Sequence, residues 1–367
     1  MIDVAIIGAG VNGAALAHAL HQQGQKVCVF ESNAIAAGGS GAAGAFINPK
    51  VTKAGPLKEL IDEAYLFSLN YYQQHFPEHT TSAPLLHIAK DSAANEKVNY
   101  FKEHTPFKCL NPQNQDIGLT SLAKEFAQVL LQDNAVLEAK EVCESMLEGI
   151  ELIKLDVTVP VRKEGAWEIN GMRCQKIVLC IGASESVFEQ EFIALRRIFG
   201  QRCEVQTSTH MPLNLHHKVS VSTTKKNGCV AIGASHYLNK NDIPNDVDGA
   251  RGLISLACES VALKDVKIIK TLTGLRSGSN DYLPLLGPLV DVKQSLKMDS
   301  SALKGNKKAQ LVYIPDVYMI NGVGGYGFVL APFLAKIMSE YLLHGKDLPT
   351  YLKPERFYYR HMKKRGA

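Results

Sequence analysis

The chain has 367 residues, of which 46% are hydrophobic and 21% charged, and its 40 Lys and Arg against 36 Asp and Glu give a formal net charge of +4. These proportions exclude disordered, collagen-like and coiled-coil proteins. The length exceeds the ~250 to 300 residues at which a single hydrophobic core stops growing, so we expect two domains.

The first thirty residues change their hydrophobic period in the order strand, turn, helix, strand. Residues 4–7 form a short apolar run, a glycine turn follows, residues 14–23 have the small side chains of a packed helix, and residues 27–30 form a second apolar run. Short apolar runs are typical of strands buried on both faces of a parallel sheet. The sequence therefore predicts a βαβ unit at the N-terminus.

Mixed α and β character continues to residue 195. The apolar spacing over residues 57–76 predicts an amphipathic helix, and a further helix is predicted over residues 119–131. Strands are predicted at residues 150–155 and 176–181.

From residue 195 to 275 short alternating segments are separated by polar turns, which predicts a mostly antiparallel sheet. Residues 318–343 return to strand, glycine loop and helix. The predicted fold class is therefore α/β, a Rossmann-like dinucleotide-binding domain with an inserted, mainly antiparallel β-sheet substrate domain. The predicted boundaries are 1–80, 115–195, 268–291 and 316–367 for the first domain, and 81–114, 196–267 and 292–315 for the substrate domain and loops.

Two features bear on the cellular compartment. Eight cysteines without a CxxC pair or zinc-site spacing favour buried, reduced thiols in a cytoplasmic protein without a metal. The apolar stretch 317–337 contains four glycines and Pro332, which make a poor lipid-spanning helix, so no membrane is expected.

A GxGxxG motif lies in the predicted βαβ unit. Gly8 permits the tight turn, Gly10 lets a pyrophosphate approach the backbone, and Gly13 lets the helix pack close to the sheet. Glu31 ends the second strand and can accept hydrogen bonds from a ribose diol. The motif predicts a dinucleotide site for NAD or FAD rather than NADP; the alternative is a small-residue packing turn.

Three further segments favour FAD over NAD. Residues 37–44 are Gly, Ala and one Ser, so their backbone amides could line an extended cofactor; a flexible surface loop is the alternative. Residues 274–288 read GLRSGSNDYLPLLGP, and residues 321–328 place the glycine loop NGVGGYGF before a helix.

At these residues the sequence resembles the D-amino-acid oxidase superfamily of FAD-dependent amine oxidoreductases. Residues 38–49, 199–202 and 231–237 resemble more narrowly the FAD-dependent half of the MnmC family, bifunctional enzymes that modify the wobble uridine of certain transfer RNAs. The first predicted domain is thus expected to bind FAD. The loop GGYGF is closer to that of small-amino-acid oxidases, which keeps the substrate open.

The resemblance implies a set of cofactor-binding residues. These are Gly8, Gly10, Gly13 and Glu31 for the ADP part, Ser40, Gly41 and Ala42 for the pyrophosphate and ring approach, Val157 for adenine, Gly182 for the wall, and Gly324, Gly325, Tyr326, Gly327 and Phe328 for the pyrimidine side of the flavin.

Arg276 is the candidate catalytic residue, since the carboxylate of an amino acid or glycine adduct needs a bidentate cation beside the flavin. A structural ion pair is the alternative role. Tyr237, Tyr326 and His236 are candidates for closing the pocket, with packing as the alternative. Arg202 either faces the same cavity or bridges strands.

The positive charge is concentrated at the C-terminus. Residues 340–367 contain seven Lys or Arg and three Asp or Glu, with four aromatic residues interleaved between 351 and 359. A basic, aromatic tail can bind phosphates and stack on unpaired bases, which suggests an RNA partner; a solvated basic end is the alternative.

The sequence thus predicts an FAD-dependent oxidoreductase acting on the CH–NH group of donors. The first hypothesis, implied by the resemblance, is oxidation of 5-carboxymethylaminomethyl-uridine in tRNA to aminomethyl-uridine and glyoxylate, with a separate methyltransferase as a further partner. The second is an oxidase or dehydrogenase of glycine, sarcosine or D-amino acids. The third is a non-catalytic, flavin-stabilised RNA-binding protein.

Overall fold

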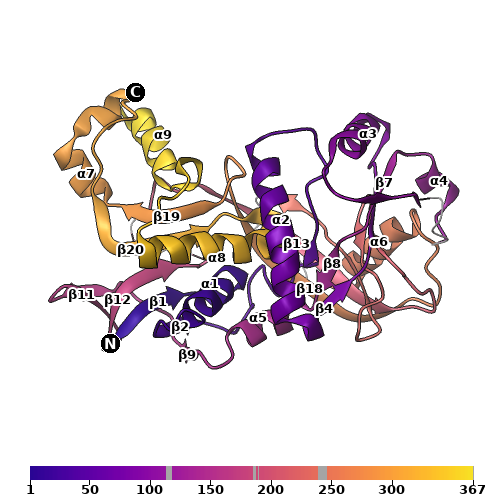
Figure 1. Ribbon diagram of the computed structural model, residues 1–367, viewed down its shortest axis with the longest axis horizontal. Coiled ribbons are helices and arrows are strands. Elements are labelled where there is room, and N and C mark those ends of the chain that lie inside the picture. Colours follow the sequence, from indigo (N-terminus) through magenta and orange to yellow (C-terminus); the bar gives the residue numbers. More distant parts are fainter. Residues whose placement is uncertain (113–117, 185–186, 189, 239–245, 367) are drawn as a thin grey trace.

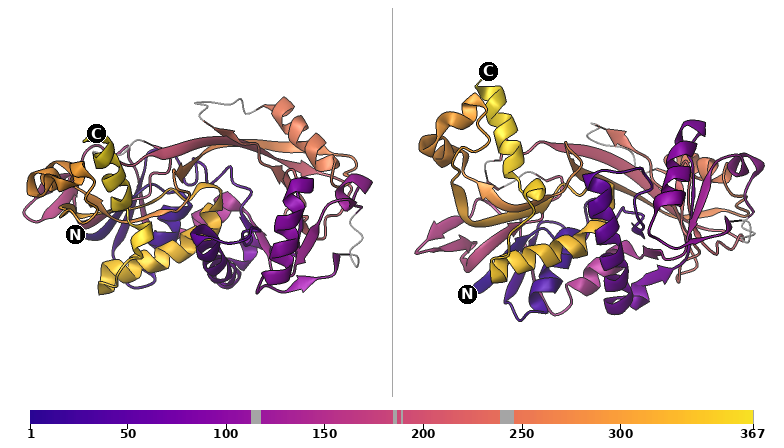
Figure 2. Two further views of the ribbon diagram at one scale, coloured as in Figure 1. Left: turned by 90° about the horizontal axis from the view of Figure 1, so that it is seen from above. Right: turned by 45° about the horizontal axis from the view of Figure 1, so that its top comes forward.

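The structure is a computed structural model that describes residues 1–112, 118–184, 187–188, 190–238 and 246–366. An eight-stranded and a nine-stranded sheet occupy the two ends of the molecule (Figure 1). Both chain termini lie at the end that holds the eight-stranded sheet (Figure 2).

The eight-stranded sheet contains the predicted βαβ unit. Its parallel strands are β9 (Glu151–Lys154), β2 (Val27–Glu31), β1 (Ile2–Ile7), β12 (Met172–Leu179) and β20 (Tyr313–Asn321), and its antiparallel strands are β10 (Val161–Lys163), β11 (Ala166–Ile169) and β19 (Leu285–Val290). Side chains alternate between two cores, because Ile6 packs on one face of the sheet and Ala5 and Ile7 pack on the other.

Helices cover both faces of this sheet. One core includes α1 (Val11–His21), α2 (Pro56–His75), α5 (Ala139–Met146) and α8 (Gly327–His344), and the other includes α9 (Glu355–Arg365) with α7 (Val292–Met298) at its margin. Among the described residues, Gly324–His344 is the one helical segment long and apolar enough to cross a membrane. It packs against α1 and α2, which accounts for its apolar composition.

Helix α2 supports the start of α8. Pro332 lacks an N–H group and therefore leaves the carbonyl of Phe328 without its helical partner. The Tyr72 hydroxyl donates to that carbonyl at 3.0 Å, and the Ser68 hydroxyl donates to the next one, that of Val329, at 2.7 Å. These bonds fix the position of the glycine loop that precedes α8.

The second sheet is built around a long antiparallel ribbon, β13 (Leu195–Gln206) with β18 (Lys267–Ser279). Its other strands are β5 (Leu85–Ile88), β6 (Cys109–Leu110), β7 (Gln128–Leu131), β14 (Asn214–His216), β15 (Ser220–Val221), β16 (Val230–Gly233) and β17 (Tyr237–Leu238). Helix α6 (Val247–Cys258) packs on its core, and α3 (Asn95–His104) packs on a satellite cluster. A small sheet joins β3 (Phe46–Ile47), β8 (Ala135–Leu137) and β4 (Thr80–Ser82).

Several sequence predictions need correction. The helix predicted over residues 119–131 is wrong: a short helix α4 (Ser121–Lys124) is followed by β7, because Val129, Leu130 and Leu131 pair with β5 and β6. For the same reason β7 belongs to the second sheet rather than to the first predicted domain. Strand β18 also lies there, held by β13. Conversely, α7 packs with the first domain's core.

The C-terminal segment is a docked helix rather than a free tail. Phe357, Tyr358 and Met362 of α9 are buried in the core of the eight-stranded sheet. Arg356 pairs with Asp281 at 3.0 Å and donates to the carbonyls of Leu283 and Pro284. The prediction of a free basic, aromatic tail is therefore wrong, because Phe357 and Tyr358 are buried and cannot stack on bases; RNA contact by its basic residues stays a prediction.

Replacing Arg356 by methionine is expected to lower the free energy of unfolding by about 2 to 3 kcal/mol at pH 7, because it leaves the half-buried Asp281 with only the exposed Arg360 as a cationic partner. Burial alone raises the pKa of Asp281, but the hydrogen bonds and charge of Arg356 outweigh it and lower that pKa below 3.8. The ion-pair stabilisation is therefore complete above about pH 4 and is lost as the pH falls further.

Urea unfolding of the Arg356→Met variant and the wild type at pH 7 and pH 3 should show the difference in unfolding free energy shrinking at acidic pH. The exposed Arg360→Met variant, as control, should cost under about 1 kcal/mol, and an Arg356 effect independent of pH would contradict the assignment to the ion pair.

Candidate functional site

A cavity of about 720 Å³, here called the central cavity, lies where the two sheets meet. It begins at the carboxyl ends of β1 and β2 and reaches the face of β13 and β18. Its walls come from the β1–α1 turn, residues 37–51, residues 155–157, residues 180–184, parts of β13 to β18, and the glycine loop 323–328. Such an elongated space suits a dinucleotide-sized ligand.

The β1–α1 turn has no room for side chains. Gly8 has φ +106°, and a Cβ atom there would lie 2.5 Å from the carbonyl oxygen of Cys180. A Cβ atom on Gly13 would lie 1.9 Å from the carbonyl oxygen of Gly8. Gly10 faces the hydroxyl of Ser40. These close approaches explain the GxGxxG spacing and leave the turn's backbone open to the cavity.

The carboxylate of Glu31, at the end of β2, is fixed by backbone hydrogen bonds. Its carboxylate accepts a hydrogen bond from the N–H of Ala9 and another from the N–H of Asn33, each at 2.8 Å. Glu31 also lines the central cavity. Two backbone donors fix the carboxylate while leaving further lone pairs for a diol.

Two helices begin at the central cavity. Neither α1 nor α8 has a side-chain hydrogen bond at its N-cap or an acidic residue in its first turn. The N–H of Val11 donates to the Ser40 hydroxyl at 3.0 Å, and the buried Asn12 Oδ1 has no partner among the described residues. Free N–H groups at helix starts favour anions. The residues present therefore fit FAD, and the starts of α1 and α8 would hold its anionic and polar parts.

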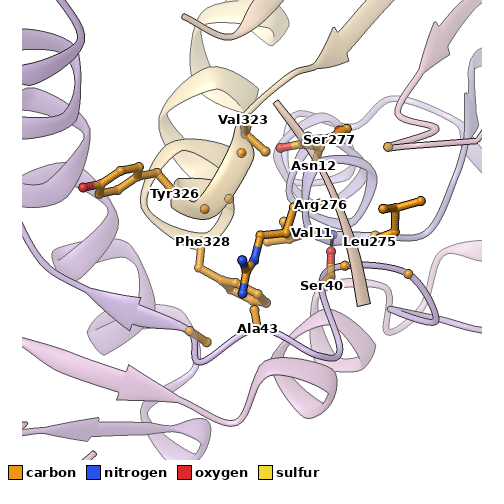
Figure 3. A pocket seen from close by; sticks show the side chains of 18 of the residues that line it. Val11, Asn12, Ser40, Ala43, Leu275, Arg276, Ser277, Val323, Tyr326 and Phe328 are labelled. Atoms are coloured by element: carbon orange, nitrogen blue, oxygen red, sulfur yellow. Dashed lines mark hydrogen bonds between the residues drawn. The ribbon is translucent and has the colours of Figure 1, made fainter. Parts of the chain in front are cut away.

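Arg276 projects from β18 into the cavity (Figure 3). Strand pairing sets it opposite Ile198 of β13, and the neighbouring glycine, Gly200, makes room for it, since a Cβ atom there would lie 2.5 Å from Arg276 Nη2. The guanidinium donates to the Ser235 carbonyl at 3.5 Å. Burial lowers the pKa of Arg276, and no carboxylate in the described part of the chain compensates its charge.

Arg202 also lines the cavity, but the carboxylate of Glu204 neutralises its charge. It pairs with Glu204 at 2.7 Å, and Glu204 pairs in turn with Lys225 at 3.1 Å. These two cations lower the pKa of Glu204 although burial opposes them. Arg202 is thus a structural ion-pair residue at the cavity wall, and Arg276 is the arginine available to a ligand.

Lys50 is a cavity cation that the sequence analysis did not identify. Its ammonium donates to the Tyr326 hydroxyl at 3.5 Å and lies 5.0 Å from the centre of that ring. Burial lowers the pKa of Lys50 and raises the pKa of Tyr326 to about 12. The Tyr326 hydroxyl points away from Arg276 (Figure 3). Tyr326 is thus positioned to hold Lys50, and its hydroxyl stays protonated.

Two histidines also escaped the sequence analysis. The parallel pairing of β14 with β5 places His216 beside His87, and both line the cavity. Burial lowers the pKa of His87 to about 3 and that of His216 to about 4. Both imidazoles are therefore uncharged at neutral pH and add polarity without charge.

The predicted site residues separate into two groups. Those that line the central cavity are Gly8, Gly10, Glu31, Ser40, Val157, Gly182, Arg276, Gly324, Gly325, Tyr326, Gly327 and Phe328. Four others do not: Gly13 packs behind Gly8, Gly41 closes a turn on Ala36, Ala42 packs toward Gly274, and Tyr237 is 41% exposed on β17. The structure therefore does not bring Tyr237 to the cavity, and His236 is likewise exposed outside it.

Replacing Gly200 by alanine is expected to displace the Arg276 guanidinium and reduce turnover about 10- to 100-fold while the cofactor stays bound, because small displacements in a site are costly. The matched control is Gly252→Ala in α6, where a Cβ atom meets nothing within 4 Å. Steady-state turnover and flavin absorbance of both variants provide the check. Wild-type turnover in Gly200→Ala would show that the position of Arg276 is unimportant.

Comparison with known proteins supports these features. A family model described as FAD dependent oxidoreductase, DAO, matches residues 3–341. The tRNA 5-methylaminomethyl-2-thiouridine biosynthesis bifunctional protein MnmC of Legionella pneumophila is 22% identical over 380 residues, which cover 96% of this chain and 56% of that protein. The MnmC of Pseudoalteromonas atlantica is 24% identical over 426 residues, 99% of this chain and 59% of its own length. The chain thus spans little more than half the length of these relatives.

Among solved structures, glycine oxidase from Bacillus cereus matches with a TM-score of 0.77 at 18% identity, covering 96% of this chain and 97% of that one. At this identity the likeness shows the fold alone. It confirms the predicted α/β class with its FAD-binding domain and mixed sheets.

Proposed function

Since the chain belongs to the DAO family of FAD-dependent oxidoreductases, we propose that it oxidises the carboxymethylaminomethyl group of the wobble uridine in tRNA. The observation that carries the proposal is Arg276, a guanidinium in the cavity wall whose charge no described carboxylate neutralises. A carboxylate-bearing amine supplies the missing anion.

The proposed substrate carries the arm CH2–NH–CH2–COO⁻ on its base. Loss of a hydride from the CH2 beside the carboxylate and of a proton from the nitrogen gives an imine, and one water then splits it into aminomethyl-uridine and glyoxylate. FAD, when bound, supplies the two-electron acceptor. Arg276 would hold the carboxylate by two parallel hydrogen bonds and so orient the adjacent CH2 group.

The described neighbours of Arg276 leave its charge without a counter-ion, which supports this role. His87 and His216 are neutral at pH 7 and Arg202 is paired, so an incoming carboxylate meets one unpaired guanidinium in this wall. Lys50, on the Tyr326 side, gives a second cationic contact for an extended anionic substrate. Both features favour anionic over neutral amines.

The tRNA part of the proposal rests on the alignment with MnmC over nearly the whole chain. Because those relatives are named as bifunctional enzymes of methylaminomethyl-uridine biosynthesis, we further propose that a methyltransferase activity acts on the aminomethyl product. Such a reaction sequence belongs in the cytoplasm, where tRNA is modified.

A second candidate function is oxidation of glycine, sarcosine or D-amino acids. The loop Gly324 to Phe328 favours it, since this loop itself contributes no charged side chain to the cavity. A third, non-catalytic RNA binding, predicts no flavin reduction at all.

Anaerobic mixing distinguishes the three. We expect bleaching of the flavin absorbance by tRNA that carries the carboxymethylaminomethyl group, and much slower bleaching by glycine, sarcosine or D-alanine at equal concentration. Fast bleaching by a free amino acid alone would select the second candidate. Absence of bleaching by every amine would select the third.

A further inference from the structure

An aromatic ring and a guanidinium lie stacked just outside the central cavity. The Arg196 guanidinium carbon is 3.8 Å from the centre of the Tyr282 ring, and Tyr282 is 60% exposed. Arg196 also donates to the Ser279 carbonyl at 3.0 Å, and no ion pair of Arg196 is found within the described part of the chain. The pair is therefore an exposed, cationic and aromatic surface.

Strand geometry places this pair at the mouth of the cavity. Arg196 lies two residues before Ile198 on β13, and Ile198 pairs with Arg276 of β18, so Arg196 and the cavity residue Arg276 project from the same face of the sheet. A Cβ atom on Gly278, opposite Arg196, would lie 3.4 Å from Arg196 Nη2 and 3.7 Å from the Cα of Gly324 in the glycine loop. Arg196 therefore lies near the part of the cavity wall that this loop forms.

Electrostatic coupling supports the same placement. Burial lowers the pKa of Lys50, and the charge of the Tyr282 group raises it. Burial lowers the pKa of His236, and the charges of Arg276 and Arg196 lower it further. Arg276 and Lys50 line the cavity and Arg196 lies beside Gly278, so three segments of the chain contribute positive charge here, which attracts a polyanion.

The Tyr282 ring is fixed in place by its own loop. Tyr282 has φ +68°, which a tyrosine adopts only where its surroundings enforce it. Its N–H donates to the Ser279 carbonyl at 3.3 Å, and the preceding Asp281 is held by Arg356 of α9 at 3.0 Å. The docked C-terminal helix thereby positions an exposed ring beside the active site.

We propose that Tyr282, stacked on Arg196, is a platform for a nucleobase that neighbours the modified uridine of tRNA. This inference rests on the proposed function and names the part of the substrate that is bound outside the cavity. Exposed aromatic rings stack on unpaired bases, and arginine beside them contributes cation–π and phosphate contacts. A free amino acid would be too small to reach this surface from the cavity.

The test compares two substrates of different size. For Tyr282→Ala, kcat/KM with the modified tRNA is expected to fall about tenfold more than kcat/KM with the free modified nucleoside, because only the tRNA carries a neighbouring base. Tyr282→Phe keeps the ring and should restore most of the loss. Tyr351→Ala, which removes a 43% exposed tyrosine from the turn before α9, is the matched control.

A measurement of RNA affinity tests the role of Tyr282 independently of the proposed oxidation. Fluorescence anisotropy with an unmodified anticodon stem-loop should show affinity about tenfold weaker for Tyr282→Ala than for wild type, whether or not the protein oxidises tRNA. Equal losses on tRNA and nucleoside would show that Tyr282 shapes the cavity instead. Unchanged stem-loop affinity in Tyr282→Ala would overturn the platform.

Discussion

Arg276→Ala is expected to lower kcat/KM for the amine substrate about 100-fold and to leave the flavin content at the wild-type level. Charge-assisted hydrogen bonds are worth about 1.5 to 3 kcal/mol each, and a factor of ten in rate corresponds to about 1.4 kcal/mol. Arg276 is free to form such bonds because Gly200 leaves it space and the described carboxylates leave its charge unused.

Two controls sharpen this prediction. Arg276→Lys keeps the charge but loses the planar pair of donors, so it should recover only part of the activity. Arg251→Ala removes an arginine that is 72% exposed on α6 and should leave turnover at the wild-type level. Stopped-flow flavin reduction and absorbance spectra give both quantities. A wild-type reduction rate in Arg276→Ala would remove Arg276 from the site.

Gly8→Ala is expected to give folded protein that binds FAD about 100-fold more weakly. Alanine at φ +106° costs roughly 1 to 2 kcal/mol in backbone strain. Its Cβ atom would also lie 2.5 Å from the Cys180 carbonyl oxygen, and such overpacking costs about 1 to 3 kcal/mol. Relief of the clash must move the turn that lines the cofactor cavity.

Gly24→Ala isolates the strain from the clash. Gly24 follows α1 with φ +75°, and a Cβ atom there meets nothing within 4 Å. This variant should lose about 1 kcal/mol of stability and keep its FAD. Circular dichroism and flavin titration of the apoprotein measure the two effects. Equal FAD affinity in both variants would show that the β1–α1 turn does not bind the cofactor.

The local motifs could be predicted from the sequence because their structure depends on near neighbours. The strand, glycine turn and helix of residues 2–21 and the glycine loop before α8 are encoded by short runs of small and apolar residues. The motif identifies Arg276 as a candidate, but its position in the cavity also depends on the pairing of β18 with β13 and on the space that Gly200 leaves. For the two glycine motifs, the backbone conformation and the chemistry lie within a few residues of each other.

The corrected predictions involve contacts between distant segments. Residues 128–131 form a strand only because β5 and β6 flank them. The aromatic residues of α9 match a surface tail in composition, but the eight-stranded sheet buries them. Tyr237 ends the segment 231–237 that carries the resemblance, yet β17 pairs with Ile198 and Phe199 of β13, and Tyr237 is 41% exposed outside the cavity.

The cavity residues that the sequence analysis missed have the same origin. His216 approaches His87 through the pairing of β14 with β5, and Lys50 reaches Tyr326 from a loop far away in the chain. No local pattern marks either residue. Lys50 and Tyr326 could have been linked from the sequence only if they were close together in it. They lie 276 residues apart and come into contact only in the folded chain.

The most direct test of the central claim is nucleoside analysis by mass spectrometry of carboxymethylaminomethyl-uridine tRNA after incubation with the purified, FAD-loaded protein in air. The proposed oxidation predicts that this nucleoside disappears, that aminomethyl-uridine replaces it, and that an equal amount of glyoxylate is released. An unchanged nucleoside after incubation with flavin-loaded protein would contradict it.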